Sequence, residues 1–238
     1  MRVCINQSNY IPWRGYFDLI HEVDLFVLYD DVQFTKNDWR NRNLIKHGEK
    51  TRWLTIPVGQ DIRRLICEVT IREPRWQKQH WESLRHAYGK APFFEWLRPF
   101  LEQIYLGGTW NSLSELNHRL IEGIGREFLG ITTRFADSRD FTLSGTGQER
   151  VLSLLKMVGA TSYLSGPAGQ AYLQPAEFAR QGIDLAWMDY TGYPTYPQSG
   201  EKFEPSVSVL DLLFNTGPAA PDYIWGWRRG QAGQARTK

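Results

Sequence analysis

The sequence has little cysteine, and its two cysteines are not arranged as metal ligands. Cys4 and Cys67 lie in separate apolar segments of the 238 residues, with no CxxC spacing and no histidine-rich neighbourhood. This pattern argues against a disulfide framework and against a structural zinc site. We therefore expect both cysteines to be small core residues, and we predict no metal site.

An excess of charge of one sign and long apolar runs are also missing. Lys and Arg number 28 against 26 Asp and Glu, a net charge of +2, so bulk charge predicts no nucleic-acid partner and any anion must be held at a local site. Pro, Gly or charge interrupts every apolar run before the ~20 residues of a spanning helix, and the first residues lack a signal-peptide core. We expect a cytoplasmic protein without membrane insertion.

Aromatic residues, in contrast, are abundant: 10 Trp, 11 Tyr and 12 Phe are spread over the whole chain, often beside Arg, Lys or Asp. Most of them are expected to lie in the core, because aromatic side chains dominate ordinary packing. Clusters that also contain polar residues suit a ligand pocket with stacking walls.

Apolar runs of strand length alternate with segments of helical periodicity, which indicates an α/β domain with a mainly parallel open sheet of Rossmann-like type. We predict one domain over residues 1–226 with a helical insertion at about 74–130, opened by Pro74, and a flexible tail over 227–238. Predicted strands cover 2–7, 25–29, 52–58, 62–71, 131–135, 161–164 and 183–188; predicted helices cover 13–23, 74–88, 93–105, 112–129, 146–158, 175–181 and 207–214.

The first polar cluster lies between the first strand and the first helix. A helix N-terminus favours an anion, and side chains in this loop add hydrogen-bonding groups. The placement resembles that in nucleotidylyl transferases with an HxGH motif, but Trp13-Arg14-Gly15-Tyr16 stands in that frame and contains no histidine. The candidate binding residues here are Gln7, Asn9, Tyr10 and Tyr16.

The second polar cluster follows the strand 25–29. Asp30 and Asp31 are adjacent, so on an extended segment their side chains point to opposite faces and only one is expected in a site. Arg42 is a planar guanidinium between two asparagines, suited to a carboxylate, a phosphate or sugar hydroxyls, although an exposed hairpin with scattered ion pairs fits the same stretch. The candidate binding residues here are Gln33, Lys36, Trp39, Arg42 and Asn43.

These two clusters and two later segments resemble the WbqC-like protein family. One departure is Ser8, where the family usually places proline, and it is expected to loosen the loop. The resemblance implies a role in bacterial gene clusters for O-antigen and related surface polysaccharides, or for natural products. The motifs are Gln7-x-Asn9-Tyr10-Ile11-Pro12-Trp13-x-Gly15-Tyr16-Phe17, Asp30-x-Val32-Gln33-Phe34-x-Lys36-x-x-Trp39-x-Asn41-Arg42-Asn43, Tyr163-Leu164-Ser165-Gly166 and Phe203-x-Pro205-x-x-Ser208-x-Leu210-Asp211-Leu212-Leu213-Phe214-Asn215-x-Gly217.

The remaining chemistry concerns one histidine and one loop. His118 follows a capping box at Ser112 and is a candidate general base, although helical histidines are often structural; His80 and His86 are six residues apart and share no helix face. Ser165 and Gly166 follow a strand and could present backbone N–H groups to an anion or carbonyl oxygen, or form a tight loop. Neither a Walker A nor a GxSxG motif is present.

Together these features favour an enzyme that transfers an acyl or aminoacyl group to an amino sugar or similar amine, with His118 or Asp30 as the base. The substrate is a small molecule, with a nucleotide-linked sugar as one candidate, and no cofactor can be named from a motif. The alternatives are a nucleotidyl or adenylyl transferase and a non-catalytic carbohydrate-binding protein. Because carboxyl ends of parallel strands meet at one edge, we predict one pocket lined by Gln7, Tyr10, Asp30 and Arg42.

Overall fold

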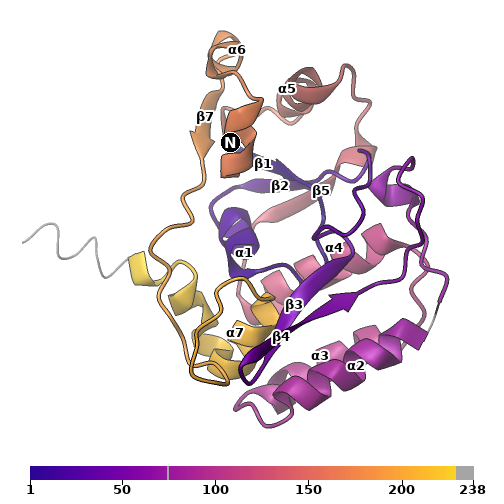
Figure 1. The fold of residues 1–238 in the computed structure, drawn as a ribbon. Helices are drawn as coiled ribbons and strands as arrows, with labels where there is room; N and C mark the ends of the chain where they lie inside the picture. Colours follow the sequence, from indigo (N-terminus) through magenta and orange to yellow (C-terminus); the bar gives the residue numbers. More distant parts are fainter. Residues whose placement is uncertain (74, 229–238) are drawn as a thin grey trace, which may run out of the picture.

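A computed structural model describes residues 1–73 and 75–228, and its centre is an all-parallel sheet of five strands (Figure 1). The chain passes from the central strand β1 outward to β2 and β5, and then returns to the other side of β1 for β6 and β7. The strand order therefore reverses beside β1, which is where open α/β sheets bind ligands. The strands are β1 (Arg2–Asn6), β2 (Leu25–Leu28), β5 (Arg134–Asp137), β6 (Ser162–Ser165) and β7 (Asp184–Trp187), in the order β5-β2-β1-β6-β7.

Helices cover both faces of this sheet, as the predicted α/β class requires. Side chains alternate between the faces: Val3 and Ile5 of β1 share a core with α5 (Gly147–Met157) and α6 (Pro175–Arg180). Cys4, between them, belongs to the larger core on the other face. That larger core includes α1 (Arg14–His21), α4 (Leu113–Gly123) and α7 (Val209–Thr216).

Between β4 and β5 the chain forms a group of helices that extends the larger core away from the sheet (Figure 1). This group comprises α2 (Arg75–Tyr88), α3 (Phe94–Tyr105) and α4, which continues into a π-helical turn over Ile124–Phe128. A separate antiparallel hairpin, β3 (Arg42–His47) with β4 (Lys50–Thr55), packs against α2. Short 3-10 helices occur at Ile66–Glu68, Ser138–Asp140, Pro167–Ala171 and Gly217–Tyr223.

Two predicted strands differ from the observed elements. Residues 62–71 form no strand: Ile66 and Val69 are both buried three residues apart, the spacing of one 3-10 turn, and the segment makes only isolated bridges. The strand predicted at 131–135 begins three residues later. Ile131 instead donates its backbone N–H to the carbonyl of Gly125, and the Thr133 hydroxyl donates to the carbonyl of Ile20, so these residues fasten α4 and α1 before the strand starts.

The strand β3 was not expected, since the sequence reads as a polar loop up to residue 43. The first strand of the hairpin buries a polar residue, Asn43, beside the apolar Ile45, and so lacks the apolar alternation that usually reveals a strand. The predicted helix start at Pro74 and the predicted tail residues 229–238 lie outside the described residues. Arg228, at the start of the segment expected as a tail, forms an ion pair with Asp18. No helix within 1–73 or 75–228 is both long and apolar enough to cross a bilayer.

Candidate functional site

Asp30 is a fully buried carboxylate just after β2, at the edge of the sheet where the strands end. It accepts four hydrogen bonds from three residues. Ser8 donates its backbone N–H at 2.9 Å and its hydroxyl at 2.7 Å, and Ser114 of α4 donates its hydroxyl. The fourth donor is Nε2 of His118, at 2.9 Å. A buried charge is tolerated only when it is hydrogen-bonded in this way, so the four donors keep Asp30 as an anion.

The hydrogen bonds also decide the direction in which the pKa of Asp30 moves. Burial alone pushes the pKa of this carboxyl up, because it penalises the charged form. The bond and charge of His118, together with the bonds from Ser114 and Ser8, outweigh burial and hold the pKa of Asp30 below its usual value. Asp30 is therefore ionised at neutral pH and serves as an acceptor.

The ionised partner determines which nitrogen of His118 carries a proton. Nε2 must be the N–H that donates to Asp30, so in the neutral imidazole Nδ1 is unprotonated. Nδ1 lies 3.7 Å from Oδ2 of Asp137, at the end of β5, beyond hydrogen-bond distance. A carboxylate that fixes the tautomer and leaves the other nitrogen basic is the arrangement that general bases use.

This group of side chains runs from the core to the surface. The exposed fraction of the side chain rises from 0% for Asp30 to 15% for His118, 18% for Asp137 and 44% for Arg139. Arg139 holds Asp137 through paired hydrogen bonds, of which the one from Nε to Oδ1 measures 3.0 Å. Burial raises the pKa of Asp137, but the hydrogen bonds from Arg139 outweigh it and leave that pKa below its usual value. Nδ1 of His118 therefore lies on the side of Asp137, the more exposed of the two carboxylates beside the imidazole.

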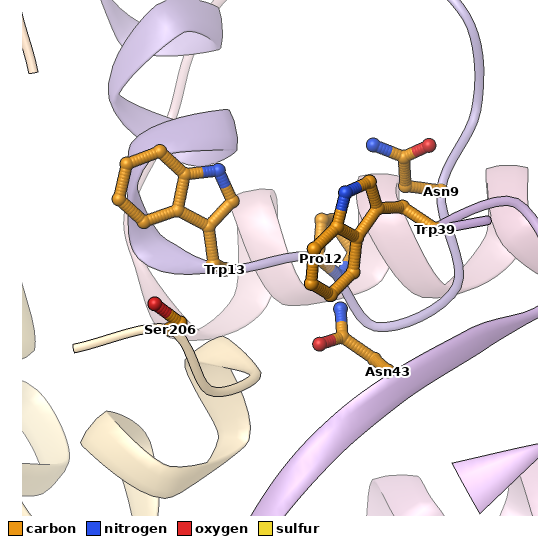
Figure 2. A pocket seen from close by; sticks show the side chains of 6 residues that line it. All are labelled: Asn9, Pro12, Trp13, Trp39, Asn43 and Ser206. Carbon is orange, nitrogen blue, oxygen red and sulfur yellow. The ribbon is translucent and has the colours of Figure 1, made fainter. Parts of the chain in front are cut away.

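A cavity of about 300 Å³ opens beside the loop that joins β1 to α1. Figure 2 shows the indoles of Trp13 and Trp39 on two sides of this cavity, with the Pro12 ring between them. Asn9 also faces it, and its side-chain Oδ1 is buried without a hydrogen-bond partner among the described residues. The six side chains that line the cavity are Asn9, Pro12, Trp13, Trp39, Asn43 and Ser206.

The cavity wall depends on a strained loop. Ile11 has φ of 37°, a left-handed conformation that a β-branched residue rarely adopts. Nδ2 of the buried Asn43 donates to the carbonyls of Tyr10 and Ile11, at 3.1 and 2.9 Å, and its Oδ1 accepts from the backbone of Leu44. Asn43 thus holds the loop in place, and all of its polar atoms are used in doing so.

Neighbouring residues connect the cavity to the Asp30–His118 pair. Ser8, which binds Asp30, is followed by Asn9 in the cavity wall. Nδ2 of Asn117, next to His118, donates to the Ser8 hydroxyl at 3.2 Å and to the Arg40 carbonyl at 2.9 Å. Arg40 follows Trp39 of the cavity wall. Both residues that accept from Asn117 are therefore next in the chain to a residue that lines the cavity.

Several predicted binding residues of the N-terminal half have structural partners. Tyr10 is fully buried, and its hydroxyl bonds to Tyr105 at 2.5 Å and to Nδ1 of His80 at 2.8 Å, so it points into the core rather than toward Asp30. Tyr16 is buried and donates its hydroxyl to the carbonyl of the half-buried Gln7 at 2.9 Å. The exposed Gln33 reaches the carbonyl of Ile62, and Lys36 bonds to Gln60.

The other predicted residues lie at strand ends or on the hairpin. Ser165 ends β6 and donates its buried hydroxyl to the carbonyl of Gly166, the N-cap of the following 3-10 helix. Arg42 begins β3 with its guanidinium 4.2 Å from the ring centre of Trp53, and its Nε has no partner among the described residues. The Trp53 ring lies 5.5 Å from that of Trp39 at an interplanar angle of 40°, so Arg42 is linked to the cavity wall through two aromatic residues in contact.

Sequence reasoning missed Ser8, Ser114 and Asp137, which surround the Asp30–His118 pair. Ser8 was expected to loosen its loop, but it is fully buried and ties the loop to Asp30 through two hydrogen bonds. Proline at that position would provide neither donor. Ser114 was detectable, since one helical turn separates it from His118 and such residues share a face.

Comparisons with known proteins agree with the motifs. The model of the WbqC-like protein family matches residues 7–223. The chain is also similar to the uncharacterized protein Rv1507c of Mycobacterium tuberculosis, with 46% identity over 225 residues that cover 94% of this chain and 97% of the relative. No solved structure matches the chain. The family match extends over both the Asp30–His118 pair and the tryptophan-lined cavity, and the chain belongs to the WbqC-like protein family.

Proposed function

We propose that this protein is an enzyme that transfers an acyl or aminoacyl group to the amine of a small polar acceptor, an amino sugar or a similar compound. The observation that carries the proposal is the imidazole of His118, fixed through Nε2 by the ionised Asp30 and left with a basic Nδ1 near the surface. An amine attacks a carbonyl only as its free base, so a positioned proton acceptor is the group that this reaction needs.

In the proposed step, His118 takes the proton of the amine and returns it to the leaving group. The amine nitrogen attacks the carbonyl carbon of an activated acyl donor, a thioester or an ester, and forms the C–N bond. Nδ1 of His118 takes the proton that the nitrogen loses, and the imidazolium is stabilised by Asp30 on the opposite nitrogen. The C–S or C–O bond then breaks, and the leaving thiolate or alkoxide takes the proton back from His118.

Membership of the WbqC-like family supports the choice of acceptor. Resemblance to this family implies a role in gene clusters for surface polysaccharides or natural products. Such a role suggests a pathway in which amino sugars are N-acylated. Backbone N–H groups near Gly166, at the end of β6, are the proposed stabilisers of the oxyanion. They follow the strand next to β1, at the point where the strand order reverses.

A transfer assay tests this function. The protein is incubated with nucleotide-linked amino sugars and a set of acyl and aminoacyl thioesters and esters, and the products are identified by mass spectrometry. We expect an amide product whose rate falls about 100- to 10,000-fold in His118→Gln, because glutamine can still donate to Asp30 but cannot accept the proton. The matched control is His86→Gln, which changes an exposed histidine of α2.

Equal rates in His118→Gln and in the unchanged protein would reject His118 as the base. A second candidate function, a carbohydrate-binding protein without turnover, is favoured by the aromatic cavity. That alternative predicts sugar binding with no amide product in any donor mixture, and binding that survives both His118→Gln and Asp30→Asn. Thermal stabilisation by ATP or CTP with Mg²⁺ would instead favour nucleotidyl transfer.

A further inference from the structure

The cavity beside the β1–α1 loop combines apolar walls with two polar side chains that bond to no described residue, Asn9 and Ser206. Trp13, Trp39 and the ring of Pro12 provide the apolar surface, and no charged side chain lines it. Trp39 is 42% exposed, an unusual state for the largest apolar side chain, and its ring contacts only the equally exposed Trp53 among aromatic neighbours. Core packing therefore does not account for this indole.

Two polar side chains of the cavity wall are free to bind a ligand. Oδ1 of Asn9 is buried and accepts no hydrogen bond from any described residue, which leaves a buried acceptor unpaired. The Ser206 hydroxyl likewise bonds to no described residue. Asn43, the second amide in the cavity, has both its nitrogen and its oxygen engaged with the loop backbone, so the Asn9 amide and the Ser206 hydroxyl are the groups left to a ligand.

We propose that this cavity binds one sugar ring of pyranose size, with its C–H face on an indole and its hydroxyls bonded to the Asn9 amide and the Ser206 hydroxyl. A saturated ring with apolar faces and hydroxyls on its rim matches aromatic walls with polar side chains at the edge. The volume of about 300 Å³ is at the low end for ligand sites, which fits one ring rather than an oligosaccharide.

This inference rests on the proposed function for the identity of the acceptor, since it names the cavity as the place where the amino sugar is held. It adds two recognition residues outside the Asp30–His118 pair, Asn9 and Trp39. Each is adjacent in the chain to a residue of the hydrogen-bonded connection, Ser8 and Arg40, so the cavity wall and the Asp30–His118 pair are built on the same two segments.

Sugar binding without any acyl donor tests the proposal. Glucosamine, N-acetylglucosamine and their UDP-linked forms are titrated while tryptophan fluorescence and saturation-transfer NMR are recorded. We expect Trp39→Ala to weaken binding at least about tenfold and Asn9→Leu about fivefold, with the C–H protons of the ring receiving the strongest saturation. Neither substitution removes a side-chain hydrogen bond, because the Trp39 indole and Oδ1 of Asn9 bond to no described residue; equal melting temperatures of the variants and the unchanged protein confirm that both fold.

The matched control is Tyr172→Ala, which removes an aromatic residue that is 61% exposed and does not line the cavity. Its affinity should equal that of the unchanged protein. Unchanged binding in Trp39→Ala, no binding by any of these sugars, or displacement of the sugar by adenosine would each overturn the inference. If Trp39 and Asn9 prove necessary for binding while no acyl donor gives an amide product, the proposed function fails and the sugar site stands.

Discussion

Two helical histidines, His80 of α2 and His118 of α4, occupy opposite chemical environments. His80 is buried, with Nδ1 bonded to the Tyr10 hydroxyl at 2.8 Å and Nε2 bonded to the Thr55 carbonyl at 3.2 Å. Burial lowers its pKa from 6.5 to about 4. His118 instead faces carboxylates on both sides and reaches the surface.

The difference shows that partner type, rather than residue type, separates a structural histidine from a chemical one. Both ring nitrogens of His80 are saturated by neutral groups, so it stays uncharged and fastens the hairpin to α2. His118 has one nitrogen held by an anion and the other beyond hydrogen-bond distance of the Asp137 carboxylate, which is the arrangement from which a proton can be taken up.

The largest expected effect is on the His118 side of this comparison. Asp30→Asn should lower the rate of acyl transfer by roughly 10⁴-fold, because an amide that donates to Nε2 forces the proton onto Nδ1 and removes the base. Asp31→Asn is the matched control, since Asp31 bonds Ser138 and Arg150 instead. Rates are compared per folded molecule, measured by circular dichroism. A similar loss of rate in both variants would show that the charge of the loop, and not the tautomer, matters.

The next largest effect concerns His80 and is a change in the free energy of unfolding with pH. The folded pKa of His80 lies below the unfolded value, so its stabilisation is complete above pH 6.5 and disappears as pH falls toward about 4, a loss of about 3 kcal/mol. His80→Gln should lack this dependence. Denaturant unfolding of both proteins at pH 7 and pH 4.5 measures the difference between them.

Comparing two proteins is necessary because other groups titrate in the same experiment. Burial raises the pKa of Asp18 and Asp211, and their contribution to the free energy of unfolding increases as pH falls. Asp30 and Asp137, with lowered pKa values, lose their contribution only below the ordinary value of 3.8. These effects are common to both proteins, so equal pH dependence in both would contradict the assignment of a neutral, structural His80.

A smaller effect is expected at the rim of the cavity. Arg42→Lys keeps the charge but loses the planar fork that lies on Trp53, and it should weaken the binding of an anionic ligand, such as a UDP-linked sugar, by about 1–3 kcal/mol. The melting temperature should hardly change, because Arg42 has no ion-pair or hydrogen-bond partner among the described residues. Calorimetric titration measures the affinity. A fall of several degrees in melting temperature with unchanged affinity would assign Arg42 a structural role.

The smallest effect is expected at Tyr10, whose hydroxyl bonds to His80 in the core. Tyr10→Phe removes the hydroxyl shared with Tyr105 and His80 and should reduce the free energy of unfolding by about 1 kcal/mol. Transfer activity should be unchanged, because the Tyr10 ring lies in the core. Loss of activity at unchanged stability would show that Tyr10 contributes to the site that the sequence had suggested for it.

The sequence was a good guide where local chemistry decides the structure. The parallel α/β sheet follows from alternating periodicities, and the capping residue Ser112 begins α4 as predicted, accepting from the backbone of Glu115. Residues 62–71 and β3 were misread because their patterns are set by contacts with distant segments. Ile66 and Val69 are buried in a single turn, and Asn43 is buried to hold the β1–α1 loop.

The sequence by itself therefore determined the class of fold, the family motifs and the list of polar groups that chemistry could use. Only the tertiary structure decided which of them meet. Asp30 and His118 are 88 residues apart and come together because β2 ends where α4 crosses the edge of the sheet, and Tyr10 turns inward because Tyr105 and His80 satisfy its hydroxyl there. The physical reason is that hydrogen bonds to a buried charge or hydroxyl must be supplied by whichever segments pack around it, and packing is a property of the whole chain.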